Sequence, residues 1–408
     1  MFSTSRNVGV GRPRLFLSLL VILIGLVMAS CGFGGGSTPT AQSTPTSAPF
    51  TPSGMPHAQG AQLVDANGHP FVLRGAQIES PFNMIKGWES GKRPTTTLNS
   101  TTFNAMAHDW HMNALRLPTS NWIYAKYPTE YMSQLDQVVH DANAAGLYVV
   151  LDLHDNVKSG SPYQSKDSLV PKTEDVTFWK AIAAHYKTNP MVMYDVFNEP
   201  VEPNWDVWLN GGGTTSDGAT IVGFQDLVNA IRSTGAQQVI VVEPGSAGGK
   251  NNGGTNPTTG AEEGGWSNFP IDHAIKDPNI MYSLHVYQNI VQSAAIQSAK
   301  WGPILNHYPI YYGEWAFLTN GTGKGALNHC QSLPTNGAQG NQVITNFLNY
   351  MASVHASWTA WQFAPHFLVQ DYSSYSPTSL PPTLTCGTQG GNVGMGSVVK
   401  QYLTTNGA

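Results

Sequence analysis

The sequence has little charge and almost no cysteine. Only 11% of its 408 residues are charged and only 3 are cysteines, whereas glycine occurs 42 times and proline 27 times. This composition argues against a helical bundle and favours a loop-rich exported enzyme or binding protein. The formal net charge of −5 makes nucleic acid and anionic membrane surfaces poor partners.

Several chemical signatures are also absent. No Gly-x-Gly-x-x-Gly follows the first apolar run and no Gly-x-x-x-x-Gly-Lys-Ser/Thr occurs, so the usual phosphate-binding loops are missing. Without a Gly-x-Ser-x-Gly elbow, a serine hydrolase is disfavoured. The apolar runs contain no His-x-His or His-Glu-x-x-His pair, which leaves a metal at His154 and His285 as a weaker alternative. We expect neither a metal nor a cofactor.

Residues 1–30 have the pattern of a signal peptide. Arg6, Arg12 and Arg14 precede the apolar run Leu15–Met28, which is short for a full membrane span. The small residues just before Cys31 resemble the lipobox of bacterial lipoproteins, which implies a lipid on Cys31. An ordinary exported protein is the alternative. We expect an extracellular or cell-surface protein that contacts the membrane only through this anchor.

A flexible tether is expected next, over residues 31–56. This stretch is rich in Gly, Ser, Thr and Pro and has no charged residue. Residues 57–408 then form the folded domain. They contain Cys330 and Cys386, an even pair that would suit a disulfide in an exported protein, although sequence does not give their separation.

Eight short apolar runs alternate with helix-like patterns in the folded domain. Eight strands alternating with helices favour a closed (β/α)₈ barrel of one domain over an open sheet. Helices are expected around Leu135–Ala142, ended by Gly146, and over Val176–Tyr186, Ile221–Ile231, Ile290–Ala299 and Val343–Val354. The runs are Phe71–Gln77, Asn113–Thr119, Tyr148–Asp155, Met191–Pro200, Gln237–Gly245, Ile280–Tyr287, Pro309–Ala316 and Ser357–Pro365.

Almost every run ends in a polar or aromatic functional group, and in a barrel these ends would share one rim. Two carboxylates stand out: Glu199 after the fourth run and Glu314 in the seventh. A pair of acids flanking one bond is the equipment of glycoside hydrolysis, in which one protonates the leaving oxygen and the other attacks or activates water. Two structural ion pairs are the alternative.

Other strand-end residues would support such a pair. Arg116 would favour the ionised form of a nucleophilic carboxylate. Asn198 can donate to a sugar 2-hydroxyl, a contact that strengthens in the transition state. Trp361 offers a flat face for a sugar ring, unless it is simply part of the core.

Six motifs in order resemble glycoside hydrolase family 5, the cellulase-type family, over about residues 57–408. Asn-Glu-Pro alone is shared by related barrel glycosidases, but the six together are specific. They are Asn113-Ala114-Leu115-Arg116-Leu117-Pro118, Leu151-Asp152-Leu153-His154-Asp155, Phe197-Asn198-Glu199-Pro200, Leu284-His285-Val286-Tyr287, Gly313-Glu314-Trp315 and Thr359-Ala360-Trp361.

The resemblance implies a retaining mechanism with Glu199 as acid/base and Glu314 as nucleophile. It further implies that Arg116 and Tyr287 contact the nucleophile and that His285 organises the site. The sugar would be held by Asn198, His154 and Trp361. Retention requires carboxyl groups only about 5 Å apart. We also expect Glu199 to stay protonated near neutral pH because a second negative charge beside Glu314 is disfavoured.

The leading hypothesis is a monomeric, exported endo-β-1,4-glucanase acting on β-linked polysaccharide or oligosaccharide. A β-mannanase, an exo-β-1,3-glucanase or another β-glycosidase of the same family are alternatives. From a different class, a non-catalytic carbohydrate-binding lipoprotein would have the same tether and aromatic residues, but loss of one acid would be expected.

Overall fold

The computed structural model describes residues 55–78, 97–155, 170–200, 204–215, 218–244, 254–255, 262–263, 265–317, 336–384 and 394–407. The expected signal peptide, the lipid-bearing Cys31 and nearly all of the tether lie outside these residues, as do Cys330 and Cys386. Those expectations remain predictions. Within the described ranges, every helix is too short or too polar to cross a bilayer.

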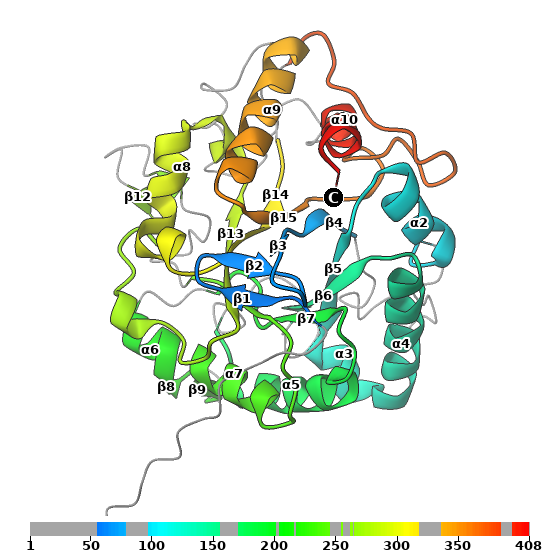
Figure 1. Cartoon of the computed structure of the whole chain (residues 1–408). Coiled ribbons are helices and arrows are strands. Elements are labelled where there is room, and N and C mark those ends of the chain that lie inside the picture. Colours follow the sequence, from blue (N-terminus) through cyan, green and yellow to red (C-terminus); the bar gives the residue numbers. More distant parts are fainter. Residues whose placement is uncertain are drawn as a thin grey trace, which may run out of the picture. The chain divides into compact units, whose positions relative to one another are not determined.

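Eight parallel strands close into a barrel, in the order β10-β13-β14-β15-β4-β5-β6-β7 (Figure 1). Each coincides with one of the eight predicted apolar runs, β5 extending one residue beyond its run, so the expected barrel is confirmed. Buried on both faces, the strands are short and apolar, as parallel strands of a barrel core must be. They are β4 (Arg74–Gln77), β5 (Ala114–Ser120), β6 (Tyr148–Asp155), β7 (Val192–Asp195), β10 (Ile240–Val242), β13 (Ile280–Val286), β14 (Ile310–Trp315) and β15 (Ser357–Ala360).

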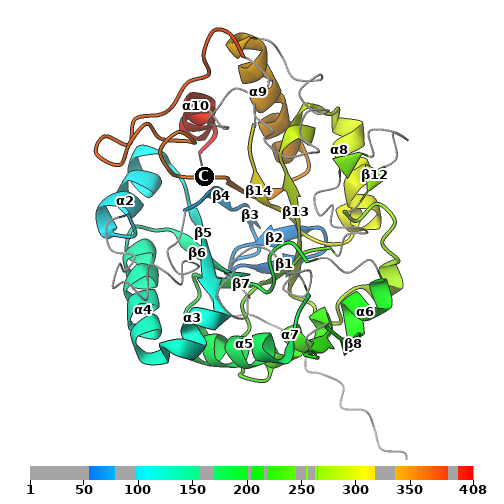
Figure 2. The ribbon, with the colours of Figure 1, turned by 180° about the vertical axis from the view of Figure 1, so that it is seen from behind.

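Helices surround the barrel, as Figures 1 and 2 show from its two sides. In α4 the expected apolar stripe, which includes Leu135 and Val139, faces the core. Gly146 follows with a φ of +96°, a conformation that suits glycine and ends the helix. The helices are α2 (Ser100–Asn104), η2 (Ala105–Asp109), α3 (Asn121–Lys126), α4 (Pro128–Ala144), α5 (Thr173–Tyr186), α6 (Trp205–Asn210), α7 (Phe224–Arg232), η4 (Ile271–His273), η5 (Gln288–Val291), α8 (Ala294–Trp301), η6 (Gly302–Asn306), α9 (Gly337–Ser353) and α10 (Gly396–Asn406).

Two expected helices are shortened or divided in the structure. Ile221 belongs to the short strand β9 (Thr220–Val222), which pairs with β8 (Gly211–Thr214). The helix α7 begins only after Gly223, where a side chain would lie 2.1 Å from the carbonyl oxygen of Leu209. The expected helix Ile290–Ala299 is divided into η5 and α8 because the Ser293 hydroxyl accepts the N–H of Ile296 and caps a new helix.

A three-stranded antiparallel sheet precedes the barrel, formed by β1 (His57–Gln59), β2 (Gln62–Val64) and β3 (Pro70–Phe71). The expected strand Phe71–Gln77 is thus two strands, β3 and β4. Leu63 of β2 packs with side chains near the beginnings of the barrel strands, among them Val150 and Met193. The blue strands of this sheet cross the centre of the ring in Figure 1 and close the N-terminal end of the barrel. A further hairpin pairs β11 (Gly254–Thr255) with β12 (Glu262–Glu263).

Candidate active site

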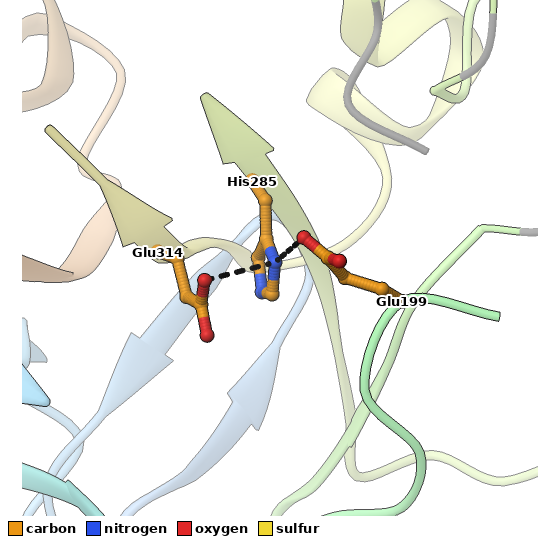
Figure 3. Close-up of side chains that lie close together, drawn as sticks. All are labelled: Glu199, His285 and Glu314. Atoms are coloured by element: carbon orange, nitrogen blue, oxygen red, sulfur yellow. Dashed lines mark hydrogen bonds and ion pairs between the residues drawn. The ribbon is translucent and has the colours of Figure 1, made fainter. Parts of the chain in front are cut away.

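Glu199, His285 and Glu314 converge at the carboxyl ends of their strands (Figure 3). Glu314 is the fifth residue of β14, His285 lies in the neighbouring β13, and Glu199 follows β7. In the close-up the imidazole stands between the two carboxylates, with one dashed contact to each. Sequence reasoning expected this meeting because parallel strand ends share one rim of a barrel.

The two carboxylates are close. One carboxylate oxygen from each glutamate and one imidazole nitrogen all lie within 4.8 Å of one another. His285 Nδ1 is 3.0 Å from Glu199 Oε1 and 3.6 Å from Glu314 Oε2. Retaining glycosidases have carboxyl groups about 5–5.5 Å apart, whereas inverting enzymes need about 6.5–9.5 Å to admit a water molecule. The spacing therefore suits direct attack by one carboxylate.

Glu314 is held from three sides. Arg116 Nη1 donates to its Oε1 at 2.7 Å, and the Tyr287 hydroxyl donates to its Oε2. His154 Nδ1 lies 3.9 Å from Oε1. Only 3% of the Glu314 side chain is exposed, so its lone pairs have little contact with bulk water. This carboxylate is fixed in orientation by charged and neutral donors, as a nucleophile requires.

Arg116 is completely buried beneath the pair. Its guanidinium contacts Asp152 at 3.1 Å, Asp195 at 2.9 Å and Glu243 at 3.2 Å, in addition to Glu314. Burial alone would lower the pKa of Arg116, but these surrounding carboxylates raise it well above its usual value. Burial in turn raises the pKa of Asp195 well above its usual range despite the nearby guanidinium. The permanently charged Arg116 is thus the common partner of four acidic side chains.

Glu199 leaves its strand with an unusual backbone. Its φ is +44°, in the left-handed region that non-glycine residues rarely adopt. Its backbone N–H donates to Glu243 Oε2 at 2.8 Å. The carbonyl of Glu243 in turn accepts the indole N–H of Trp208 at 2.9 Å. About a third of the Glu199 side chain is exposed, so it faces the open side of the site while Glu314 lies deeper.

His285 and Glu199 share the proton of the site, and their surroundings favour the protonated imidazole. Burial works against the charged imidazole, but Glu243 and Glu314 raise the pKa of His285 well above its usual value. Burial would raise the pKa of Glu199, yet the hydrogen bond and charge of His285 lower it. These pKa directions run against the expectation that Glu314 keeps Glu199 protonated, because the imidazole stands between the two acids.

His154, Asn198 and Trp361 are each partly exposed. The rings of His154 and Trp361 are stacked, with centroids 6.2 Å apart. His154 Nδ1 lies 2.7 Å from Asp152 Oδ2, and burial notwithstanding, this contact raises the pKa of His154. Arg116 Nη2 donates to Asn198 Oδ1 at 3.0 Å, so the amide nitrogen is the end that can donate to a sugar.

Four members of the site were not assigned from sequence: Gln77, Asp152, Asp195 and Glu243. Arg116 Nη1 donates to Gln77 Oε1 at 2.5 Å, and the carboxylates contact the same guanidinium. Asp152 and Asp195 are register neighbours on β6 and β7. A signal was present, since an acid inside an apolar strand must be paired when the strand is buried. The eight predicted residues are all brought together with these four.

The same cluster offers donors for a cation. Glu199, His285 and Glu314 each present one ligand atom of a type that divalent metals accept. Within the described residues both carboxylates already have partners: Glu314 contacts the guanidinium of Arg116, and Glu199 contacts the imidazole of His285. This arrangement suits acid and base chemistry better than metal binding.

Comparison with known proteins identifies the chain's relatives. A family model described as "Cellulase (glycosyl hydrolase family 5)" matches residues 64–367. Endoglucanase E-5 of Thermobifida fusca is 24% identical over 79% of this chain, and Endoglucanase MaCel5A of Microbulbifer sp. (strain ALW1) is 24% identical over 78%. The matches span 58% and 53% of those two proteins, so the chain matches little more than half of their length.

Solved structures share the fold. The beta-glucanase SdGluc5_26A from Saccharophagus degradans, crystallised with cellotetraose, superposes with a TM-score of 0.60 at 20% identity. That alignment covers 87% of this chain and 94% of the other. The catalytic domain of Thermobifida fusca endoglucanase Cel5A gives a TM-score of 0.55 at 20% identity, covering 86% and 97%.

Proposed function

The chain belongs to glycosyl hydrolase family 5, and on this basis we propose that it is a retaining endo-β-1,4-glucanase. The observation that carries the proposal is the close pair Glu199 and Glu314, whose oxygens lie within 4.8 Å on the rim of the barrel. The separation is that of a nucleophile and an acid/base flanking one glycosidic bond. The names of the endoglucanase relatives support a β-glucan substrate.

In the first half of the reaction the carboxylate of Glu314 attacks the anomeric carbon. Arg116 and Tyr287 hold the two oxygens of Glu314 in place, so the nucleophile is positioned before the sugar arrives. The bond to the leaving oxygen breaks as that oxygen takes a proton from Glu199. The product is a glycosyl ester on Glu314 and a shortened chain with a free hydroxyl.

The proton for this step comes from the pair formed by His285 and Glu199. The imidazole Nδ1 lies 3.0 Å from Glu199 Oε1, which is within direct transfer distance. The proton that His285 and Glu199 share passes through Glu199 to the leaving oxygen, so the first half ends with Glu199 as a carboxylate and His285 as a neutral imidazole. In the second half, Glu199 takes a proton from water, which attacks the ester and releases the sugar with its original configuration.

The partly exposed residues Asn198, His154 and Trp361 would bind the sugar. The amide nitrogen of Asn198 is directed by Arg116 so that it can donate to the 2-hydroxyl, where the contact strengthens in the transition state. Trp361, stacked with His154, offers an apolar face to a pyranose ring beside the scissile bond.

A mechanism-based inactivator tests the proposal. A 2-deoxy-2-fluoro cellobioside with a good leaving group should esterify Glu314, and mass spectrometry of the digested protein should find the sugar on the peptide that contains it. An adduct on another residue would remove Glu314 from the nucleophile role. Absence of any adduct, with the sugar bound, would favour the non-catalytic carbohydrate-binding lipoprotein.

A panel of purified polysaccharides tests the substrate. We expect cleavage of β-1,4-glucan with a rapid fall in viscosity, because an endo-acting enzyme cuts inside chains. Preferential release of mannan fragments would indicate a β-mannanase, and release of single glucose units from β-1,3-glucan would indicate an exo-β-1,3-glucanase. Product analysis on defined oligosaccharides distinguishes these outcomes.

We propose further that the protein is exported and anchored through a lipid on Cys31, and that it acts as a monomer. Two features of the sequence support this location. In residues 1–30 arginines precede an apolar run, as in a signal peptide, and small residues stand just before Cys31. In a bacterial host, Cys31→Ser should release the protein into the medium and abolish labelling by a fatty acid, while Cys330→Ser should leave both unchanged. Fatty-acid labelling that survived Cys31→Ser would exclude this anchor.

A further inference from the structure

Glu243 is a buried acid at the carboxyl end of β10. Its carboxylate contacts the backbone of Glu199 and the imidazole of His285. We propose that Glu243 is a positioning residue for the acid/base step: its carboxylate holds the backbone of Glu199 and the imidazole of His285 in the arrangement that delivers the proton. The proposal rests on the proposed function of Glu199 as acid/base.

Each oxygen of Glu243 has a distinct task. Oε2 accepts the backbone N–H of Glu199 at 2.8 Å. Oε1 lies 2.9 Å from His285 Nε2 and accepts from Arg116 Nη2 at 3.2 Å. Only 3% of the side chain is exposed, so it is too enclosed to bind a sugar itself. Glu243 therefore acts on the reaction through other residues.

The contact with the backbone fixes where Glu199 points. Glu199 has a φ of +44°, which costs energy for a residue other than glycine and persists only where neighbours hold it. The nearby carboxylate provides that hold through the N–H of this same residue. The Trp208 indole secures Glu243 in turn by donating to its carbonyl at 2.9 Å. Without the contact between Glu243 and the Glu199 N–H, the Glu199 side chain could turn away from the oxygen that it must protonate.

The contact with the imidazole fixes which nitrogen faces Glu199. With a carboxylate at Nε2, the ring presents Nδ1 to Glu199 at 3.0 Å. In the part of the chain that the structure describes, the other charged or titratable groups around this ring are Glu314 on β14, with Oε2 3.6 Å from Nδ1, Tyr287 just beyond β13, Arg116 on β5 and Asp195 on β7. Glu199 and Glu314 approach the ring at Nδ1, whereas Glu243 contacts it at Nε2.

A negative charge at this position should set the alkaline limit of activity. Glu243 is a leading contributor to the raised pKa of His285. Removing the charge makes the proton shared by His285 and Glu199 easier to lose, whichever of the two holds it. The alkaline limb of the pH profile should then move to lower pH. A purely structural role would reduce stability or activity without moving that limb.

The test is the pH dependence of kcat/KM on β-1,4-glucan oligosaccharides for Glu243→Gln. The amide keeps the shape and an acceptor for the Glu199 N–H but lacks the charge. We expect kcat/KM to fall roughly 10- to 100-fold and the alkaline limb to move down by about one pH unit. The matched control is Glu174→Gln, the same chemical change at an exposed position of α5, which should change neither kcat/KM nor the alkaline limb.

A synthetic substrate separates proton delivery from other defects. With a dinitrophenyl cellobioside, whose leaving group needs no proton, Glu243→Gln should lose much less activity than with the oligosaccharides. Equal losses on both substrates, or an alkaline limb as in the parent protein, would overturn the proposal. If Glu243→Gln does not fold, Glu243→Asp decides: its shortened carboxylate should lower kcat and move the limb by a smaller amount, and an unchanged profile would contradict the proposal.

A measurement without substrate distinguishes failure of this inference from failure of the proposed function. NMR of histidine-labelled protein, with the His285 signal assigned by its loss in His285→Asn, gives the titration of the imidazole directly. His285 should titrate at lower pH in Glu243→Gln than in the parent protein. A parent protein that cleaves no β-glycan would refute the proposed function, and this titration would still decide whether Glu243 controls His285.

Discussion

The hydroxyl of Tyr287 donates to Oε2 of Glu314, from just beyond the end of the neighbouring strand β13. This contact and that of Arg116 use opposite oxygens of the carboxylate. Tyr287 is itself unsuited to lose its proton, since burial and the Glu314 charge raise its pKa well above the usual value. It therefore remains a donor throughout the working pH range.

Replacing Tyr287 with Phe should lower kcat roughly 10- to 100-fold, since a hydrogen bond to a charged group contributes about 1.5–3 kcal/mol. The carboxylate keeps its contact with Arg116 but gains freedom to turn away from the anomeric carbon. Steady-state kinetics on an oligosaccharide would measure the loss. Tyr308→Phe, a half-buried tyrosine packed on Tyr282 instead, is the matched control and should retain full kcat. A loss confined to KM would argue that Tyr287 binds sugar instead.

Glu314→Gln should reduce kcat by at least about 10³-fold, because the amide cannot form the glycosyl ester. Binding of cellotetraose should persist and can be measured by calorimetry. Glu174→Gln on α5, at an exposed site, is a control for the same chemical change. Hydrolysis near the parent rate by Glu314→Gln would mean that another residue attacks the sugar.

Asp175 should make the fold less stable as pH rises from about 4 to about 7. Its buried carboxyl accepts the Lys172 N–H at 2.7 Å and the Asn121 amide at 2.5 Å, yet burial raises its pKa to about 7. Unfolding restores an ordinary value of about 3.9. The folded chain therefore binds the proton more tightly in this interval, and the free energy of unfolding falls as pH increases.

Asp175→Asn should remove this part of the pH dependence. Between pH 5 and pH 8 the parent protein should lose roughly 2 kcal/mol more stability than the variant. Denaturant unfolding at both values gives the difference. Asp226→Asn, at the same position of α7 but exposed, controls for loss of a capping carboxylate. Parallel pH profiles for the parent and Asp175→Asn would show that Asp175 titrates normally.

Leu63→Ala should lower the free energy of unfolding by about 2–5 kcal/mol, the usual cost of a cavity in a core. Leu63 closes the barrel at the end away from the catalytic strand ends, so kcat should stay unchanged at a temperature where the variant is folded. Leu63→Met, which conserves volume, should cost less than about 1.5 kcal/mol. A fall in kcat together with stability would mean that this end of the barrel influences the site.

The barrel could be predicted from sequence because each buried strand is a short apolar run. The sheet β1–β3 was missed since its strands have two or three residues, too few to show alternation. The division between β3 and β4 depends on distant partners: the Asn113 side chain accepts the Arg74 N–H and donates to the Val72 carbonyl. No local pattern contains that information.

The candidate site was predictable to the extent that its residues stand at strand ends. Glu199, Glu314 and Arg116 were found in this way. Glu243 was given no role from sequence, because its role depends on the distances to His285 and to the Glu199 backbone. The lowered pKa of Glu199 could not be predicted for the same reason, since sequence does not show that an imidazole lies between two acids.

At Glu199, catalytic activity requires an acid, whereas the left-handed backbone would be more stable with glycine. That conformation costs about 1–2 kcal/mol for a side chain with a Cβ and almost nothing for glycine. Selection for thermal tolerance alone would therefore favour glycine at this position and eliminate the acid. Directed evolution that screens for heat resistance without also screening for hydrolysis should recover inactive, more stable proteins altered at this residue.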